Sequence, residues 1–402
     1  MSKEKIIIIL TVLIDVIGVG IVIPIMPLYL QSFGASAFMI ALLFSIFSFF
    51  SFISAPMLGT LSDRIGRRPV LIVSIISTAI GWFVFASGHA LWILFLGRII
   101  DGMAAGNFPI AQSYLADLSK TDKERTANMG LIGAVFGMGF IIGPALGAIL
   151  STISPTFPFW FVGGLATLNA IGALLFLPET HLNRNKTVKV HLNPFVPIAN
   201  AFNDVQLRGR YLAWFLFGLG IAIQHSIFAL FLNYRFGFTA TMTGYLMATM
   251  GVIMVFNQGF LLKKFWLKYF QESNLEIWIF LVGAVAFALL LVSNFVIFAI
   301  GLVLIVFFQS TARVVMSSRV AGMAGPANRG ETMGVMASIL SASMIIGPLI
   351  AGSLFQAYNL LPFGLASLFV LLAFVIMKKC CKEVGMVSAS DGVDLSTTPE
   401  VF

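Results

Sequence analysis

The sequence predicts an all-α membrane protein whose twelve transmembrane helices form two pseudo-symmetric six-helix bundles. Three observations support this prediction. First, 59% of the 402 residues are hydrophobic and only 10% are charged, whereas a soluble domain is about 25% charged. Second, the chain contains twelve apolar runs long enough to cross a bilayer. Third, its two halves repeat each other. The composition also excludes a disordered chain, which requires low hydrophobicity.

Each predicted span has roughly the length of about 20 apolar residues that a helix needs to cross a bilayer. The first six spans lie near residues 5–30, 37–60, 69–88, 91–115, 127–150 and 157–177. The other six lie near residues 210–233, 241–262, 275–293, 295–318, 331–356 and 361–378. Barrel strands would be shorter and would alternate apolar with polar residues. The first run is too long for a cleaved signal peptide and lacks a small-residue cleavage site.

Positive charges predict the orientation of these spans. Nearly all of the 24 Lys and Arg residues fall in segments on the same side as the N-terminus, which the positive-inside rule identifies as the cytoplasm. Only Arg235 falls on the opposite side, while Arg98 and Arg313 fall within spans. Both termini are therefore expected to be cytoplasmic. The net charge of +8 reflects this asymmetry, because no basic face with interleaved aromatics suggests a nucleic-acid partner.

An internal repeat relates the two halves of the chain. With a shift of 204 residues and no gaps, Ile141–Pro144 falls on Ile345–Pro348, and both read Ile-Ile-Gly-Pro. Like-oriented halves are typical of transporters that bind their substrate between the halves, near the membrane midplane. We expect an N-terminal bundle over 1–177, a cytoplasmic linker over 178–209, a C-terminal bundle over 210–382 and a disordered cytoplasmic tail over 383–402.

Several motifs resemble those of the major facilitator superfamily. The segment 59–68, Gly-Thr-Leu-Ser-Asp-Arg-Ile-Gly-Arg-Arg, is similar to its signature loop between spans two and three. Residues 24–27, 98–106 and the glycines of span five resemble further motifs of its drug:proton antiporters. Asp15, residues 66–70 and the Ala-Asp pair at 116–117 resemble the tetracycline-efflux type. The resemblance implies the major facilitator fold and secondary transport. Tetracycline antiporters also carry acids within spans three and nine, whereas this chain has only Glu276, at the edge of span nine.

Charges in the signature loop make it a candidate gate. They bring both signs to the membrane boundary, where Coulomb attraction grows as water is excluded, and glycines there permit close backbone approach. The resemblance implies that Asp117, at the inner end of span four, pairs with the loop cations. Alternatively, the basic residues only orient the helices. The candidate gate residues are Gly59, Asp63, Arg64, Gly66, Arg67, Arg68 and Asp117.

Acidic and basic side chains within the spans are candidates for proton coupling. Asp15 lies near the middle of span one, where a lone charge is costly, so the carboxyl group must protonate or find a partner. It either carries a proton or forms a hydrogen bond that fixes helix packing. Arg98 and Asp101 share one helix face. They either neutralise each other, or Arg98 lowers the proton affinity of Asp15 or Asp101; the resemblance places Arg98 in the proton-relay motif.

Other polar residues within spans are candidates for substrate binding. Arg313 aligns by the repeat with Pro109, close to the helix face of Arg98, so we expect it to face a central cavity. There it binds an anionic substrate or balances Asp15 or Asp101; a third interpretation is a boundary charge that reaches toward water. Polar side chains in spans also often connect helices. The candidate substrate residues are Asn107, Gln112, Gln224, His225, Gln309 and Arg313.

Glycine-proline pairs predict a bent, tightly packed helix in each half, since proline removes a backbone donor and glycine allows close helix contact. This candidate kink motif comprises Gly133, Gly137, Gly143, Pro144, Gly147, Gly347 and Pro348. The resemblance links the pattern with antiport.

These observations together predict a transporter and not an enzyme. The sequence contains no phosphate-binding loop for ATP, no metal-ligand cluster and no nucleophile elbow, so we expect no cofactor. The leading hypothesis is a monomeric, proton-coupled antiporter in the plasma membrane, most naturally a bacterial inner membrane, that exports a small amphipathic compound. The alternatives are an uptake or facilitative carrier of an anionic metabolite or siderophore-like compound, and a non-transporting sensor.

Overall fold

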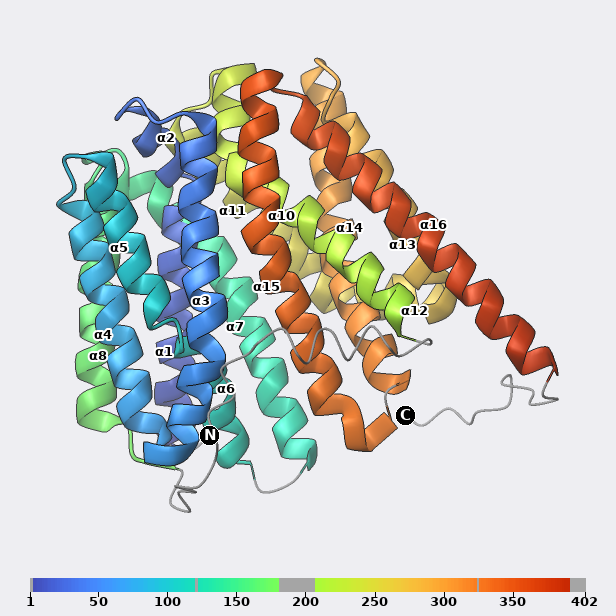
Figure 1. The fold of residues 1–402 in the computed structure, drawn as a ribbon, viewed down its shortest axis with the longest axis horizontal. Coiled ribbons are helices and arrows are strands. Elements are labelled where there is room, and N and C mark those ends of the chain that lie inside the picture. Colours follow the sequence, from blue (N-terminus) through green and yellow to red (C-terminus); the bar gives the residue numbers. More distant parts are fainter. Residues whose placement is uncertain (1–2, 120–121, 181–206, 324, 391–402) are drawn as a thin grey trace. The chain divides into compact units, whose positions relative to one another are not determined.

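The computed structural model describes residues 3–119, 122–180, 207–323 and 325–390, and these contain helices and turns but no strand (Figure 1). Within these ranges, twelve helical segments are long and apolar enough to cross a membrane. Each overlaps one of the twelve predicted spans, so the predicted all-α fold is confirmed. The candidate linker 178–209 and the candidate tail 383–402 fall largely outside the described residues.

The described part of the first six spans contains eight helices, because two spans are each divided in two. They are α1 (Lys3–Val22), α2 (Met26–Gln31), α3 (Ala37–Ile65), α4 (Arg67–Ala86), α5 (Leu91–Met103), α6 (Asn107–Asp117), α7 (Asp122–Leu150) and α8 (Phe157–Phe176). The remaining helices are α10 (Arg208–Phe236), α11 (Ala240–Phe256), the π-helix η1 (Asn257–Trp266), α12 (Leu267–Tyr269), α13 (Glu272–Leu289), α14 (Phe295–Met323), α15 (Gly325–Ala357) and α16 (Leu361–Ser390).

Two predicted spans are interrupted. The span predicted over 5–30 is wrong as a single helix, because α1 ends at Val22 and a turn precedes α2; Pro24 and Pro27 lack the N–H groups that would continue the helix. The span predicted over 91–115 breaks at residues 104–106, between α5 and α6. There the backbone of Ala104 leaves the helical region, and Gly106 donates to its carbonyl at 2.7 Å.

Other boundaries also differ from the predictions. The span predicted over 241–262 continues to Tyr269, because η1 adds a wider turn after α11. The helix α16 runs to Ser390 and so enters the segment predicted to be disordered. Both α7 and α15 continue without interruption through Pro144 and Pro348, so a lost backbone donor ends neither helix.

The described chain forms two compact units, each considered by itself. One contains α1 to α8, residues 222–256 of α10 and α11, and the end of α15 from Ser341. In it α1 packs against α7 and α8, α4 against α5 and α8, α3 against α5, and α7 against α11. The other contains the start of α10, η1 to α14, the start of α15 and α16, with α13 packed against α14.

Glycines set the closeness of packing around α7. A Cβ atom at Gly143 would come within 2.7 Å of the Gly20 Cα atom of α1, and one at Gly147 within 2.6 Å of the Ile21 carbonyl oxygen. On the α11 side, a Cβ atom at Gly244 would lie 2.7 Å from the Pro144 carbonyl oxygen. The predicted tight packing of this helix is therefore observed at Gly143 and Gly147. A Cβ atom at Gly133 would meet nothing within 4 Å.

Candidate functional site

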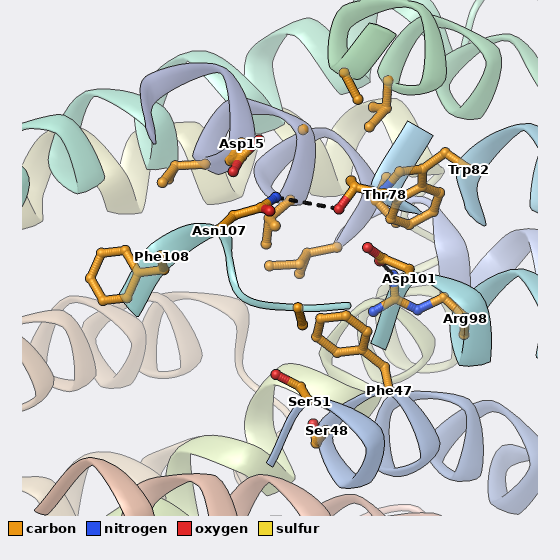
Figure 2. A pocket seen from close by; sticks show the side chains of 18 of the residues that line it. Asp15, Phe47, Ser48, Ser51, Thr78, Trp82, Arg98, Asp101, Asn107 and Phe108 are labelled. Atoms are coloured by element: carbon orange, nitrogen blue, oxygen red, sulfur yellow. Dashed lines mark hydrogen bonds and ion pairs between the residues drawn. The ribbon is translucent and has the colours of Figure 1, made fainter. Parts of the chain in front are cut away.

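A cavity of about 410 Å³ lies within the first compact unit. Its wall comes from α1 to α8, together with His225 of α10 and Met344 of α15. Most lining side chains are apolar and several are aromatic. Figure 2 shows Asp15, Asn107, Thr78, Asp101 and Arg98 in one neighbourhood, and Ser48 and Ser51 on another part of the wall. A largely apolar concave site with a few convergent polar groups is the usual form of a small-molecule site.

Asp15 faces this cavity from the middle of α1. Asn169 of α8 donates from Nδ2 to Asp15 Oδ1 at 3.3 Å and to the Thr11 carbonyl oxygen at 3.2 Å. Asn107 of α6 also interacts with the Asp15 carboxyl group. No cation within the described residues forms an ion pair with Asp15. Its environment is therefore polar but contains only neutral hydrogen-bond donors.

Arg98 and Asp101 form a buried ion pair on α5. Arg98 Nη1 lies 2.7 Å from Asp101 Oδ2, and the two residues are only 7% and 6% exposed. The guanidinium also stacks on aromatic rings, with its central carbon 3.9 Å from the Phe47 ring centre and 4.9 Å from that of Trp82. Cation–π contacts of this kind gain strength when water is excluded. The pair thus neutralises itself in this conformation, as one of the two interpretations requires.

The remaining candidate substrate residues divide into two groups. Asn107 and His225 line the cavity. Gln112, Gln224, Gln309 and Arg313 are not among its lining residues. Gln224 is buried within α10, and Arg313 is exposed on α14 of the other compact unit.

The loop between α3 and α4 holds a network around Arg67. Arg67 Nη1 lies 2.6 Å from Asp63 Oδ1 and donates to Ser62 Oγ at 2.7 Å, while Arg67 Nε lies 3.1 Å from Asp117 Oδ2 at the end of α6. The structure therefore brings Asp117 onto a loop cation, as expected from the resemblance. Gly66 stands between the two helices with φ of 114°, a conformation that favours glycine.

The sequence model of the major facilitator superfamily matches residues 8–271. The chain belongs to this superfamily. It is thus a secondary transporter and a multi-pass membrane protein that acts on small molecules, and it is not an enzyme.

Relatives of this superfamily member include drug-resistance proteins. It is 32% identical to the class H tetracycline resistance protein of Pasteurella multocida, over 69% of this chain and 70% of that protein. It is 28% identical to the class C tetracycline resistance protein of Escherichia coli, over 89% and 91%. It is 26% identical to the quinolone resistance protein NorA of Staphylococcus aureus, over 91% and 93%.

Solved structures confirm the fold of the transporter. The human organic anion transporter MFSD10 aligns with a TM-score of 0.72 at 23% identity, over 94% of this chain and all of that chain. A peptide transporter aligns with a TM-score of 0.80 at 12% identity, over 96% of each chain. At these identities the likeness concerns the fold alone.

A close contact between α4 and α5 brings the carboxyl group of Asp101 next to span three. A Cβ atom at Gly81 of α4 would lie 2.7 Å from the Gly97 carbonyl oxygen and 2.9 Å from the Asp101 Cβ atom. At Gly97 a Cβ atom would likewise lie 2.6 Å from the Gly81 carbonyl oxygen. Span three carries no acid, but Asp101 places a carboxyl group against this face of span three from the neighbouring helix.

Glu179 is a site residue that the sequence reasoning missed. Its carboxylate accepts from the backbone N–H groups of Arg67 at 2.9 Å and Arg68 at 3.3 Å, at the start of α4. A Cβ atom at Gly66 would overlap Glu179 Oε2. A carboxylate stabilises the unpaired N–H groups of a helix N-terminus. An available signal was the acid of Pro-Glu-Thr at 178–180, directly after span six.

A second missed cluster surrounds Glu276 in the other compact unit. Arg210 Nε donates to Glu276 Oε1 at 2.8 Å and Arg210 Nη2 to Oε2 at 3.2 Å, while Arg319 Nε lies 3.4 Å from Oε2. Glu276 is fully buried and Arg210 is 2% exposed. From the sequence alone these arginines indicate only the cytoplasmic side, and Glu276 is only an acid at the edge of span nine. The cluster ties the ends of α10, α13 and α14 together.

Proposed function

We propose that this transporter is a proton-coupled antiporter that exports small amphipathic organic compounds by alternating access. The observation that carries the proposal is Asp15, a membrane-embedded carboxyl group in the cavity wall with the neutral donors Asn107 and Asn169 beside it. Removal from water disfavours the charged form of such a group. Its proton occupancy therefore changes as the cavity opens to one side of the membrane or the other.

The other charged groups of the cavity support a role for Asp15 rather than for Arg98 in carrying the proton. Arg98 is bound to Asp101 in this conformation, and an arginine does not give up its proton in proteins. In our proposal the Arg98–Asp101 pair sets the electrostatic potential around Asp15. Protons enter at Asp15 from outside, and substrate and proton occupy the cavity in alternation.

The composition of the cavity wall supports a flat, amphipathic substrate. Phe108 packs edge-on against Phe136, with ring centres 5.0 Å apart, and Phe136 stacks beside Phe140. Two carboxyl groups against one guanidinium leave an excess of negative charge, which favours a neutral or cationic compound over an anion. The names of the related tetracycline and quinolone resistance proteins agree with an aromatic drug-like substrate.

The anion-carrier alternative lacks such support. It rests on Arg313 and on the absence of acids within spans three and nine, whereas the arginine among the described residues that line this cavity is Arg98, which is paired with Asp101. We therefore keep export of a neutral or cationic compound as the proposal.

Gating is proposed for the loop network around Arg67. Contacts of Arg67 with Asp63 and Asp117 hold the ends of α3, α4 and α6 together, so their breakage would release these ends. We further propose that the bundles 1–177 and 210–382 rock against each other, with both termini in the cytoplasm, in a bacterial inner membrane and as a monomer. The tight contacts of Gly143 and Gly147 would keep α7 bound to α1 during this motion.

The test is transport in membrane vesicles with an imposed pH gradient. A panel of fluorescent aromatic cations serves as substrate, and we expect accumulation that collapses when an ionophore dissipates the gradient. Asp15→Asn should abolish gradient-driven accumulation while ligand-dependent thermal stabilisation persists. Glu4→Gln, an acid at the start of the same helix, is the control and should transport normally. Accumulation indifferent to the pH gradient would reject the proposal.

A further inference from the structure

A row of polar side chains joins the two acids of the cavity. In Figure 2, Asn107 and Thr78 lie between Asp15 on one side and Asp101 with Arg98 on the other. Asn107 Nδ2 donates to Thr78 Oγ1 at 3.3 Å. The Asn107 amide also interacts with the Asp15 carboxyl group, and the Thr78 hydroxyl with that of Asp101. The row spans α1, α6, α4 and α5.

The direction of these hydrogen bonds suits two charged acids. An ionised carboxylate only accepts hydrogen bonds, so Asn107 presents its N–H groups to Asp15 and to Thr78. The Thr78 hydroxyl has one proton, and because its oxygen accepts from Asn107, that proton is available to Asp101. In this arrangement Asn107 Oδ1 is buried without a hydrogen-bond partner among the described residues, an unfavourable state for a polar atom.

Protonation of Asp15 changes the hydrogen-bonding group that Asn107 must present to it, from a donor to an acceptor. A protonated carboxyl group donates a hydrogen bond, and Asn107 Oδ1 is the buried acceptor on its neighbour. Half a turn of the Asn107 amide exchanges Oδ1 and Nδ2, so that the oxygen faces Asp15 and Thr78. The Thr78 hydroxyl then donates to Asn107 and is withdrawn from Asp101, which retains the ion pair with Arg98.

We propose that Asn107 and Thr78 are positioning residues that transmit the proton occupancy of Asp15 to the hydrogen bonding of Asp101. This inference rests on the proposed role of Asp15 as the proton site. The other charged or titratable groups that line the cavity are Arg98 of α5 and His225 of α10, because α2, α3, α4, α6, α7, α8 and α15 contribute no such side chain to the wall. Asn107 is the first residue of α6, directly after the break at 104–106. The residue that responds to protonation of Asp15 therefore lies where span four is interrupted.

Infrared difference spectroscopy tests the coupling in purified full-length protein without substrate. Titration bands of the two acids are assigned with Asp15→Asn and Asp101→Asn, and the carboxyl region excludes His225. We expect the carboxylate stretch of Asp101 to shift as Asp15 takes up its proton. Thr78→Val and Asn107→Leu should each abolish that shift, whereas Thr78→Ser, which keeps the hydroxyl group, should retain it.

The matched control is Asn169→Leu, which removes the other donor to Asp15 but does not touch Thr78. It should leave the response of Asp101 intact. Melting temperatures of all variants establish that they fold. Three results would overturn the coupling. The Asp101 band could stay unchanged when Asp15 is protonated in the unaltered protein, the shift could persist in folded Thr78→Val, or the shift could be lost equally in Asn169→Leu. If Asp15 shows no titration at all, the proposed function fails as well, which separates the two failures.

Discussion

The buried cluster around Glu276 predicts a large loss of stability from a single substitution. Glu276→Leu removes the carboxylate that faces Arg210 and Arg319. Arg210 is 2% exposed, so its guanidinium would stay buried after losing the Glu276 carboxylate. Removing one member of a buried ion pair costs about 3–5 kcal/mol. Replacing both members by apolar residues is often close to neutral.

A double-mutant cycle turns this argument into a measurement. The free energy of unfolding is determined in mixed detergent micelles for Glu276→Leu, Arg210→Met and the double variant. We expect each single variant to lose about 3–5 kcal/mol and the double variant to recover most of that loss. Arg319→Gln is the control, because the Arg319 side chain is 33% exposed at 3.4 Å, and it should lose no more than about 1 kcal/mol. Single variants that lose less than the Arg319 control, or a double variant whose loss equals the sum of the singles, would refute the reasoning.

Two further predictions concern glycines. In Gly66→Ala the alanine must adopt a positive φ and its Cβ atom overlaps Glu179. The free energy of unfolding should therefore fall by about 1–3 kcal/mol. An unchanged melting curve would contradict the contact between Gly66 and Glu179. Gly143→Ala meets the Gly20 backbone at 2.7 Å and should lower the melting temperature. The control Gly133→Ala on the same helix meets nothing within 4 Å and should be neutral or stabilising by up to about 1 kcal/mol. Equal effects at the two positions would argue against the α1–α7 contact.

The twelve spans could be predicted because each depends on the summed hydrophobicity of about 20 residues. Hydrophobicity summed over a whole span does not reveal a local interruption of the helix. Residues 104–106 are Ala-Ala-Gly, which read as continuous span, yet the backbone leaves the helix there. Likewise the π-helical turn at Asn257 depends on side-chain contacts: Asn257 donates to Ser310 at 2.7 Å and accepts from Trp266 at 2.8 Å. Ser310 is 53 residues from Asn257, beyond a window of about 20 residues.

Site residues could be predicted where the residue type or its spacing within a span is unusual by itself. Asp15 stands out because an acid inside a span is costly, and Arg98 and Asp101 because their spacing makes them neighbours. Glu179 was missed because its partners are backbone N–H groups, which exist at every helix start. Thr78 was missed because a hydroxyl in a span is common, and its importance depends on Asn107 from another helix.

The glycine contact between α4 and α5 limits how substrate preference can evolve in this transporter. Gly81 and Gly97 hold two backbones in contact, so any larger residue there separates the helices and displaces Asp101. A substitution at Gly81 or Gly97 therefore changes the spacing of α4 and α5 and, with it, the position of the neighbouring cavity wall. New preferences are expected instead at Phe108, Phe136 and Phe140, whose side chains can change size without such a backbone contact. Changes in substrate preference should therefore occur in the aromatic wall and spare the glycines.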